Sequence, residues 1–420
     1  MKIEETELKN GAKIIGINKP EAKSVAIFFG FKVGSRSETL KILGTSHFIE
    51  HMMFKGSKKY PSAKILAEKA DALGASWNAF TDKEMTIYHI WTASENFDLA
   101  LDLVGDMVTR PLFVEQEIKK EAGTIIQEIN MYEDIPMYNM ETEMIYEIVY
   151  GDTPLGRNIG GTKETVAKTT KKDIEKYYNN FYNGENLVVV LVGKLPHDFK
   201  DKIKEYASRF DKGKKNQVYK VGFSKKDKLS IREKKTDQSH IGVAVPAFNW
   251  GNRKAPAASI IATILGGYMS SRLFTEIREK RGWAYYIHGE YRAMSDTGFL
   301  TFFGGIKNKS AFEAIELIKK ELINFPETIV EEEIERAKGH IRGIRELRYE
   351  NPASLASYIG SQFLTKGSYE LPPKALMKLE KVKKKEIVNI SKELFKKDQI
   401  RLAAIGPFKD EAKFAKILQR

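Results

Sequence analysis

The first half of the chain alternates between strand-like and helix-like patterns of apolar residues. Alternating or continuous apolar runs predict a hairpin around Asn10-Gly11, a strand at 24–34, a strand pair in SWNAFTDKEMTIYHIWTA at 76–93 and a buried strand at 186–193. Apolar residues at the spacing of a helical face predict helices over 44–55, 62–73, 94–109, 114–132 and 137–149. Glycines close the first two of these helices, at Gly56 and Gly74. This order of elements indicates an α+β fold, in which helices cover a sheet.

The second half repeats this order. A strand-like run, HIGVAVPAF, is followed by a helix pair over 256–280, a hairpin over 283–305 and a further helix over 310–322. Gly282 precedes its hairpin as Gly74 precedes the hairpin of the first half. The repeat predicts two homologous domains, each a mostly antiparallel sheet packed against helices.

A basic stretch from Asp211 to Thr236 separates the two halves. We expect a first, site-bearing domain over 1–213, a basic linker over 214–229 and a second domain over 230–420. The alternative for this stretch, one long surface loop, would leave the two-domain organisation unchanged.

Composition narrows the classes of function. The 69 Lys and Arg exceed the 56 Asp and Glu, giving a net charge of +13, but the basic residues are spread along the chain without a nucleic-acid recognition motif. We therefore expect no nucleic-acid partner. No apolar run approaches the roughly 20 residues that span a bilayer, and the N-terminus lacks the apolar core of a signal peptide. These features predict a cytoplasmic protein with no membrane partner.

The absence of cysteine restricts a metal site to histidine and carboxylate ligands. Within the helix predicted over 44–55, His47, Glu50 and His51 stand at i, i+3 and i+4 and so share one face. Two imidazoles one turn apart can reach one zinc ion, and a glutamate beside them can act as a general base toward water. HxxEH is known as the signature of the inverted zincins. The alternative is a surface helix with incidental histidines, and a third protein ligand would decide between the two.

The helix predicted over 114–132 offers acidic side chains for this third ligand. Glu121 and Glu128 stand seven residues apart and therefore on one face. A solvated helix also presents a face of glutamates, so spacing alone does not choose among these acids.

Several longer stretches resemble one known family. The segments GTSHFIEHMMFKGS, EAGTIIQEINMYEDIP, PLGRNIGGTKETV, FYNGENLVVVLVG and SSRLFTEIREKRGWAYYI are similar to the family of inverted zincins that includes pitrilysin, insulin-degrading enzyme and mitochondrial processing peptidase. The likeness covers most of the chain and is greatest for the short, single-subunit bacterial or archaeal-type branch. It implies a metallopeptidase of duplicated α+β fold whose domains face each other in a clamshell dimer.

The resemblance also implies the metal ligands. One zinc ion per chain would be held by His47, His51 and Glu128. Glu50 would be the general base, and Glu121 would support the site from outside the ligand set.

Further residues match positions with which the family binds substrate. Asn78 and Ala79 correspond to an edge strand that accepts substrate as an added strand. Arg278 and Tyr285 correspond to a pair that contacts substrate and stabilises the tetrahedral intermediate. Because one chain carries both the zinc site and this pair, we expect a homodimer in which the second domain of one subunit completes the site of the other.

The expected function is that of a zinc-dependent endopeptidase that cleaves short or unfolded peptides inside a closed chamber. The alternative is a catalytically silent core subunit of the same fold. Such subunits typically lose metal ligands, whereas this chain keeps all of them.

Overall fold

The computed structural model describes residues 2–226 and 228–419, which form two compact units. The first unit comprises Met1–Ile129, Asn158–Tyr219 and Glu346–Leu371. The second unit comprises Asn130–Arg157, Lys220–Arg345 and Pro372–Arg420. Each unit contains one sheet and its covering helices.

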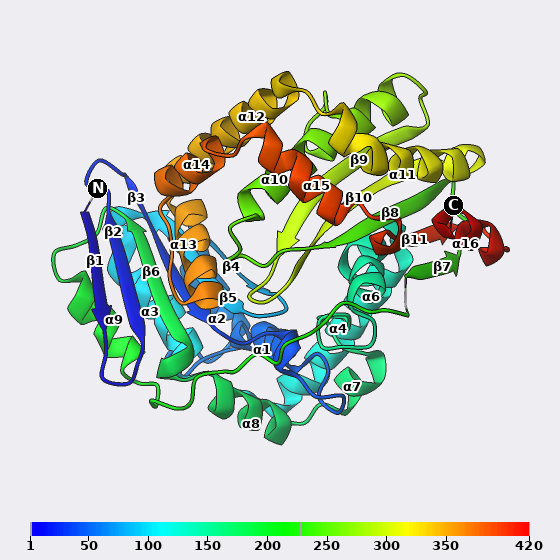
Figure 1. The fold of residues 1–420 in the computed structure, drawn as a ribbon. Coiled ribbons are helices and arrows are strands. Elements are labelled where there is room, and N and C mark those ends of the chain that lie inside the picture. Colours follow the sequence, from blue (N-terminus) through cyan, green and yellow to red (C-terminus); the bar gives the residue numbers. More distant parts are fainter. Residues whose placement is uncertain (1, 227, 420) are drawn as a thin grey trace. The chain divides into compact units, whose positions relative to one another are not determined.

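The sheet of the first unit has six strands in the order β1-β2-β6-β3-β5-β4 (Figure 1). The strands are β1 (Lys2–Glu7), β2 (Lys13–Asn18), β3 (Ser24–Phe31), β4 (Ser76–Thr81), β5 (Thr86–Ala93) and β6 (Leu187–Gly193). Only β2 and β6 run parallel in this sheet. Strand β4 lies at an edge, with β5 as its one partner.

The sheet of the second unit has the order β7-β11-β8-β10-β9. Its strands are β7 (Leu229–Glu233), β8 (Gln238–Ala247), β9 (Ala284–Ala293), β10 (Gly298–Lys307) and β11 (Arg401–Gly406). Here β7 and β11 are the parallel pair. The order matches β2-β6-β3-β5-β4 strand for strand, so β9 is the counterpart of β4. This shared topology confirms the predicted pair of homologous α+β domains.

Two glycines occupy corresponding places in the units. Gly74 and Gly282 have φ angles of 56° and 60°, a left-handed conformation that favours glycine because it has no side chain. Each ends a helical segment immediately before an edge strand. The two positions therefore correspond because both require a left-handed backbone conformation.

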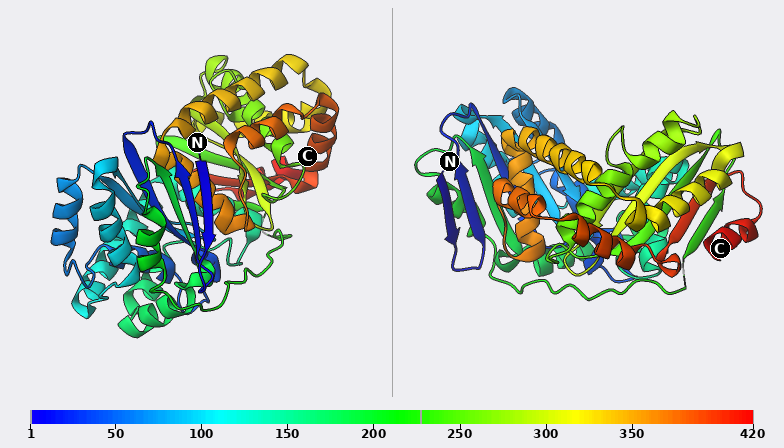
Figure 2. Two further views of the ribbon diagram at one scale, coloured as in Figure 1. Left: turned by 90° about the vertical axis from the view of Figure 1, so that its left-hand side faces the viewer. Right: turned by 45° about the horizontal axis from the view of Figure 1, so that its top comes forward.

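Helices cover both faces of the first sheet. They are α1 (Thr45–Met53), α2 (Ala63–Ala72), α3 (Phe97–Thr109), α4 (Glu115–Asp134, which ends in the second unit), α7 (Lys163–Lys168), α8 (Lys171–Phe181), α9 (Phe199–Ala207) and α13 (Pro352–Lys366). Helix α3 packs against β3 and β5, and α13 packs against β3 and β6 (Figure 2). Two separate apolar clusters line the two faces of the sheet.

The second sheet is covered in the same way. Its helical segments are α5 (Pro136–Asn139), a π-helical turn η3 (Met140–Met144), α6 (Ile145–Tyr150), α10 (Ala255–Gly266), a π-helical turn η5 (Phe274–Glu279), α11 (Ala311–Thr328), α12 (Glu331–Glu350, which ends in the first unit), α14 (Pro372–Glu380), α15 (Lys384–Leu394) and α16 (Glu411–Gln419). Helix α11 packs against β8, and α6 packs against β8 and β11. The helix predicted as continuous over 137–149 is therefore interrupted by η3.

Each sheet receives a helix from the other half of the sequence. Helix α13 belongs to the second half but packs on β3 and β6 of the first unit. Helix α6 belongs to the first half but packs on β8 and β11, the counterparts of β3 and β6. The approach of α13 is close, because a Cβ at Gly360 would stand 2.6 Å from the Phe28 ring. The predicted linker over 214–229 stays a prediction. Each compact unit contains a helical segment from the other side of this stretch.

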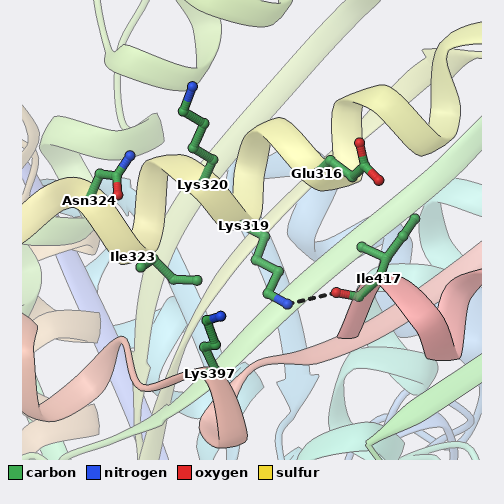
Figure 3. Close-up of a pocket in the computed structure, with 7 residues that line it drawn as sticks. All are labelled: Glu316, Lys319, Lys320, Ile323, Asn324, Lys397 and Ile417. Atoms are coloured by element: carbon green, nitrogen blue, oxygen red, sulfur yellow. Dashed lines mark hydrogen bonds between the residues drawn. The ribbon is translucent and has the colours of Figure 1, made fainter. Parts of the chain in front are cut away.

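A buried lysine on α11 forms hydrogen bonds to the C-terminal helix α16. Lys319 on α11 donates to the carbonyl oxygens of Ile417 and Leu418 at 2.6 and 3.1 Å. These carbonyls lie at the end of α16, where a positive charge is favourable. Lys319 also lines a pocket of about 350 Å³, together with other residues of α11, Lys397 and Ile417 (Figure 3).

Candidate metal centre

Helix α1 presents its polar residues on one side because its other side is buried. Phe48, Ile49 and Met52 are fully enclosed in the core of the first unit. His47 and His51 remain partly accessible. The amphipathic spacing predicted for this helix is confirmed, and it directs the two imidazoles away from the core.

A buried carboxylate fixes the start of α1. Both oxygens of Glu38 accept backbone hydrogen bonds at 2.7 Å, from the N–H groups of Gly44 and Ser46. Burial raises the pKa of Glu38 to about 7, although these two donors act in the opposite direction. Because Ser46 precedes His47, these bonds fix the backbone immediately before the first histidine.

Helix α4 delivers two glutamates to the same place. Ile118, Ile125 and Ile129 are buried and anchor one face of the helix. Glu121 and Glu128, seven residues apart, project toward α1 from an adjacent stripe. The spacing that left the choice of third ligand open in the sequence thus places both acids at the site.

Three side chains form a compact group of potential metal ligands: His47, His51 and Glu128. The two Nε2 atoms are 3.2 Å apart, and Oε2 of Glu128 lies 3.7 Å from the first and 3.4 Å from the second. Nitrogen and oxygen ligands arranged tetrahedrally at about 2.0–2.1 Å from a zinc ion would stand about 3.3–3.4 Å from one another. The donor set and its spacing therefore fit a zinc ion.

Glu121 occupies a different position from Glu128. Its Oε1 lies 2.8 Å from Nδ1 of His51, on the side of the ring opposite the group. Because a carboxylate can only accept, Nδ1 of His51 carries a hydrogen, which leaves Nε2 as the nitrogen that a metal ion can bind. Lys55, one turn after His51, binds the other oxygen of Glu121 at 2.5 Å. Burial opposes ionisation of Glu121, but His51 and Lys55 outweigh it and lower the pKa of this carboxyl group.

The two histidines differ in protonation. Burial, with His51 adding its charge, lowers the pKa of His47 to about 4. Burial acts in the same direction on His51, but Glu121 and Glu128 outweigh it and raise its pKa to about 9. His47 is therefore neutral, while the proton on His51 is one that a bound cation would displace.

Glu50 lies beside this group without belonging to it. Its Oε2 accepts a hydrogen bond of 2.5 Å from the hydroxyl of Thr81, the last residue of β4. Burial raises the pKa of Glu50, and the hydrogen bond from Thr81 opposes that effect. The carboxylate is consequently held by the edge strand on one side of α1.

The other predicted residues fall into two places. Asn78 and Ala79 lie in the middle of β4, where Asn78 is exposed and Ala79 is buried. Arg278 and Tyr285 belong to the second unit, so the structure describes them only within it. The guanidinium of Arg278 lies 5.7 Å from the centre of the Tyr285 ring and 4.6 Å from that of Phe274. Tyr285 is 75% exposed, which leaves its hydroxyl accessible.

Sequence reasoning missed three side chains that support the site: Glu38, Lys55 and Thr81. The sequence pointed to Lys55, because it stands four residues after His51 within the helix predicted over 44–55. It pointed more weakly to Thr81, because Thr81 shares a strand face with Ala79. Glu38 was not indicated, since it lies in an irregular segment before the helix it clamps.

Two family patterns match consecutive parts of the chain. The pattern described as Insulinase (Peptidase family M16) matches residues 13–163, and that described as Peptidase M16 inactive domain matches residues 168–340. The chain belongs to peptidase family M16. The family predicted from the sequence stretches around the HxxEH motif is thereby confirmed.

Relatives of this M16 chain align over nearly their whole length. A Bacillus subtilis (strain 168) protein described as uncharacterized zinc protease YmxG is 33% identical, over 95% of this chain and 97% of its own. A Rickettsia felis protein described as an uncharacterized zinc protease is 34% identical, over 93% and 94%.

Solved structures share the fold. A protease from Helicobacter pylori has a TM-score of 0.88 at 20% identity and covers 97% of this chain and 99% of its own. A chain of Complex III2 from Candida albicans has a TM-score of 0.83 at 19% identity, over 99% and 100%. At these identities the likeness establishes the two-domain α+β fold alone. Within residues 2–226 and 228–419, no helix is long and apolar enough to cross a membrane.

Proposed function

We propose that this chain is a zinc-dependent endopeptidase of the M16 type. The observation that carries the proposal is the convergence of His47, His51 and Glu128 at the spacing of zinc ligands, with Glu50 beside them. The relatives described as zinc proteases support it. A catalytically silent subunit would have no need of a complete ligand set or of a carboxylate at the general-base position.

The chemistry follows from the positions of these groups. Zinc in such a site acts as a Lewis acid that polarises a peptide carbonyl and lowers the pKa of water. Glu50 accepts the proton of the water that attacks the carbonyl carbon, then delivers it to the leaving nitrogen as the C–N bond breaks. The products are a new carboxylate and a new amine, and Glu50 returns to its ionised form.

The proposed substrates are short or unfolded peptides. Strand β4 has a paired edge toward β5 and a second edge at which an extended peptide could add as a further strand. Asn78 and Ala79 would line this edge, and backbone pairing would accept many sequences. Enclosure of the substrate in a chamber, the cytoplasmic location and the absence of nucleic-acid or membrane partners stay predictions.

Removal of zinc should abolish cleavage, and its return should restore it. We expect the purified chain to cleave an unstructured peptide library, to lose activity with a zinc chelator and to regain it after dialysis into stoichiometric zinc. Mass spectrometry of the products would measure this and give the cleavage preference. A zinc-loaded chain that leaves every peptide intact would instead support the silent-subunit alternative.

We further propose that Arg278 and Tyr285 donate hydrogen bonds to the oxyanion, and that the chain acts as a homodimer in which they serve the partner's zinc site. The support is that both lie side by side in the second unit and that the Tyr285 hydroxyl is accessible. A guanidinium and a phenol are suitable donors to developing negative charge.

Mixing two inactive variants should recover activity if the site is shared. Glu50→Gln and Tyr285→Phe homodimers each lack one component at every site, whereas a mixed dimer would hold one site with both. Random reassociation should therefore return about a quarter of the wild-type rate. A mixture no more active than the separate variants would contradict the shared site.

A further inference from the structure

The carboxylate of Glu50 is held by a single side chain. Within the part of the chain that the structure describes, the hydrogen-bond partner of Glu50 is Thr81, whose hydroxyl donates to Oε2 at 2.5 Å. The backbone N–H of Thr81 also lowers the pKa of Glu50, so both hydrogen-bond donors that favour its ionised form belong to this one residue. A glutamate carboxylate otherwise rotates broadly about its last torsion, so one short bond changes its orientation substantially.

Thr81 itself is fixed by the sheet. It is the last residue of β4 and pairs with Thr86 of β5. Its side chain lies on the same strand face as Ala79, which is buried in the core cluster that also contains the apolar side of α1. The donor is thus mounted on a rigid element that contacts the helix carrying Glu50.

We propose that Thr81 is a positioning residue for the reaction. Its hydroxyl holds Oε2 of Glu50 so that the remaining oxygen is the one that accepts the proton of the attacking water. The proposal rests on the endopeptidase function proposed above. It also joins the general base to the end of the edge strand on which the peptide would bind, so that substrate and base are aligned by one element.

Valine and serine substitutions separate the hydroxyl from the shape of the side chain. Thr81→Val keeps the branched shape but removes the donor, whereas Thr81→Ser keeps the donor. We expect Thr81→Val to lower kcat by about 10- to 100-fold, because a misplaced catalytic group has effects of this size. KM and zinc content should stay within twofold of wild type, and Thr81→Ser should restore most of kcat.

A double substitution tests whether Thr81 acts through Glu50. In a Glu50→Gln background, Thr81→Val should cause little further loss, because the carboxylate that it positions is already gone. Equal losses in both backgrounds would overturn the inference, as would a kcat unchanged in Thr81→Val or a fall in kcat matched by loss of zinc. A zinc-loaded wild-type chain without peptidase activity would overturn the proposed function itself, which is a distinguishable result.

Discussion

Glu50→Gln should greatly slow peptide cleavage and leave zinc bound. The substitution keeps the size of the side chain but removes its ability to accept a proton from water. Because general acid–base catalysis contributes about 10²- to 10⁴-fold, we expect kcat to fall by that factor. Glu50 lies outside the group formed by His47, His51 and Glu128, so the metal content should not change. Steady-state cleavage of a fluorogenic peptide and elemental analysis of the same sample would measure both quantities.

A surface glutamate provides the matched control for this prediction. Glu68 on α2 is exposed and pairs with Lys64 at 3.7 Å, so Glu68→Gln removes the same charge away from the site. It should retain full activity. A Glu50→Gln chain that keeps both its zinc and wild-type kcat would show that another group moves the proton.

Glu128→Gln should cost the chain its zinc and, with it, both activity and metal-linked stability. An amide is neutral and a far weaker zinc ligand than the carboxylate whose Oε2 faces the two Nε2 atoms. A metal held in thousandfold excess over its dissociation constant stabilises the folded state by about 4 kcal/mol. We therefore expect added zinc to raise the thermal unfolding midpoint of wild type and to leave that of Glu128→Gln unchanged.

Glu121→Gln is the matched control, because it makes the same Glu-to-Gln change on the same helix at a residue outside the group of metal ligands. Glu121 contacts Nδ1 of His51 rather than the metal-facing side of the ring. Loss of such an outer partner typically weakens metal affinity by about 10- to 100-fold, which is less than loss of a ligand. The expected order of zinc affinity is wild type, then Glu121→Gln, then Glu128→Gln, as measured by competition with a chromophoric chelator. The reverse order of the two variants would exchange their roles.

Local sequence patterns were sufficient to predict the helix that carries the HxxEH motif. The spacing of His47, Glu50 and His51 placed them on one face, and burial of the intervening apolar residues confirms it. The two-domain organisation was equally accessible, because strands, helices and Gly74 and Gly282 recur in the same order.

The third metal ligand and the residues that support the site depend on contacts between distant parts of the chain. Spacing alone could not choose Glu128 over its neighbours, because the helix that presents it meets α1 only in the folded unit. The resemblance to a family supplied that choice. Sequence patterns did not indicate Thr81 and Glu38 for the same reason, since each makes its polar contacts to groups more than five residues away.

The exchange of helices between the halves was likewise invisible to sequence patterns. An amphipathic helix shows that it has an apolar face but does not show which sheet receives it. Helix α13 could have covered either sheet by its periodicity. Close packing of Gly360 on the ring of Phe28 makes the first sheet its partner, and such complementarity is a property of two surfaces together.

The zinc content of the wild-type chain, measured beside Glu128→Gln after purification without added metal, tests the central claim most directly. Inductively coupled plasma mass spectrometry with protein quantified by amino-acid analysis gives the ratio. The account predicts about one zinc per wild-type chain, since one group of three ligands can hold one ion, and almost none in Glu128→Gln. A wild-type chain that stays free of zinc after incubation with it, or a variant that binds zinc as tightly as wild type, would contradict the account.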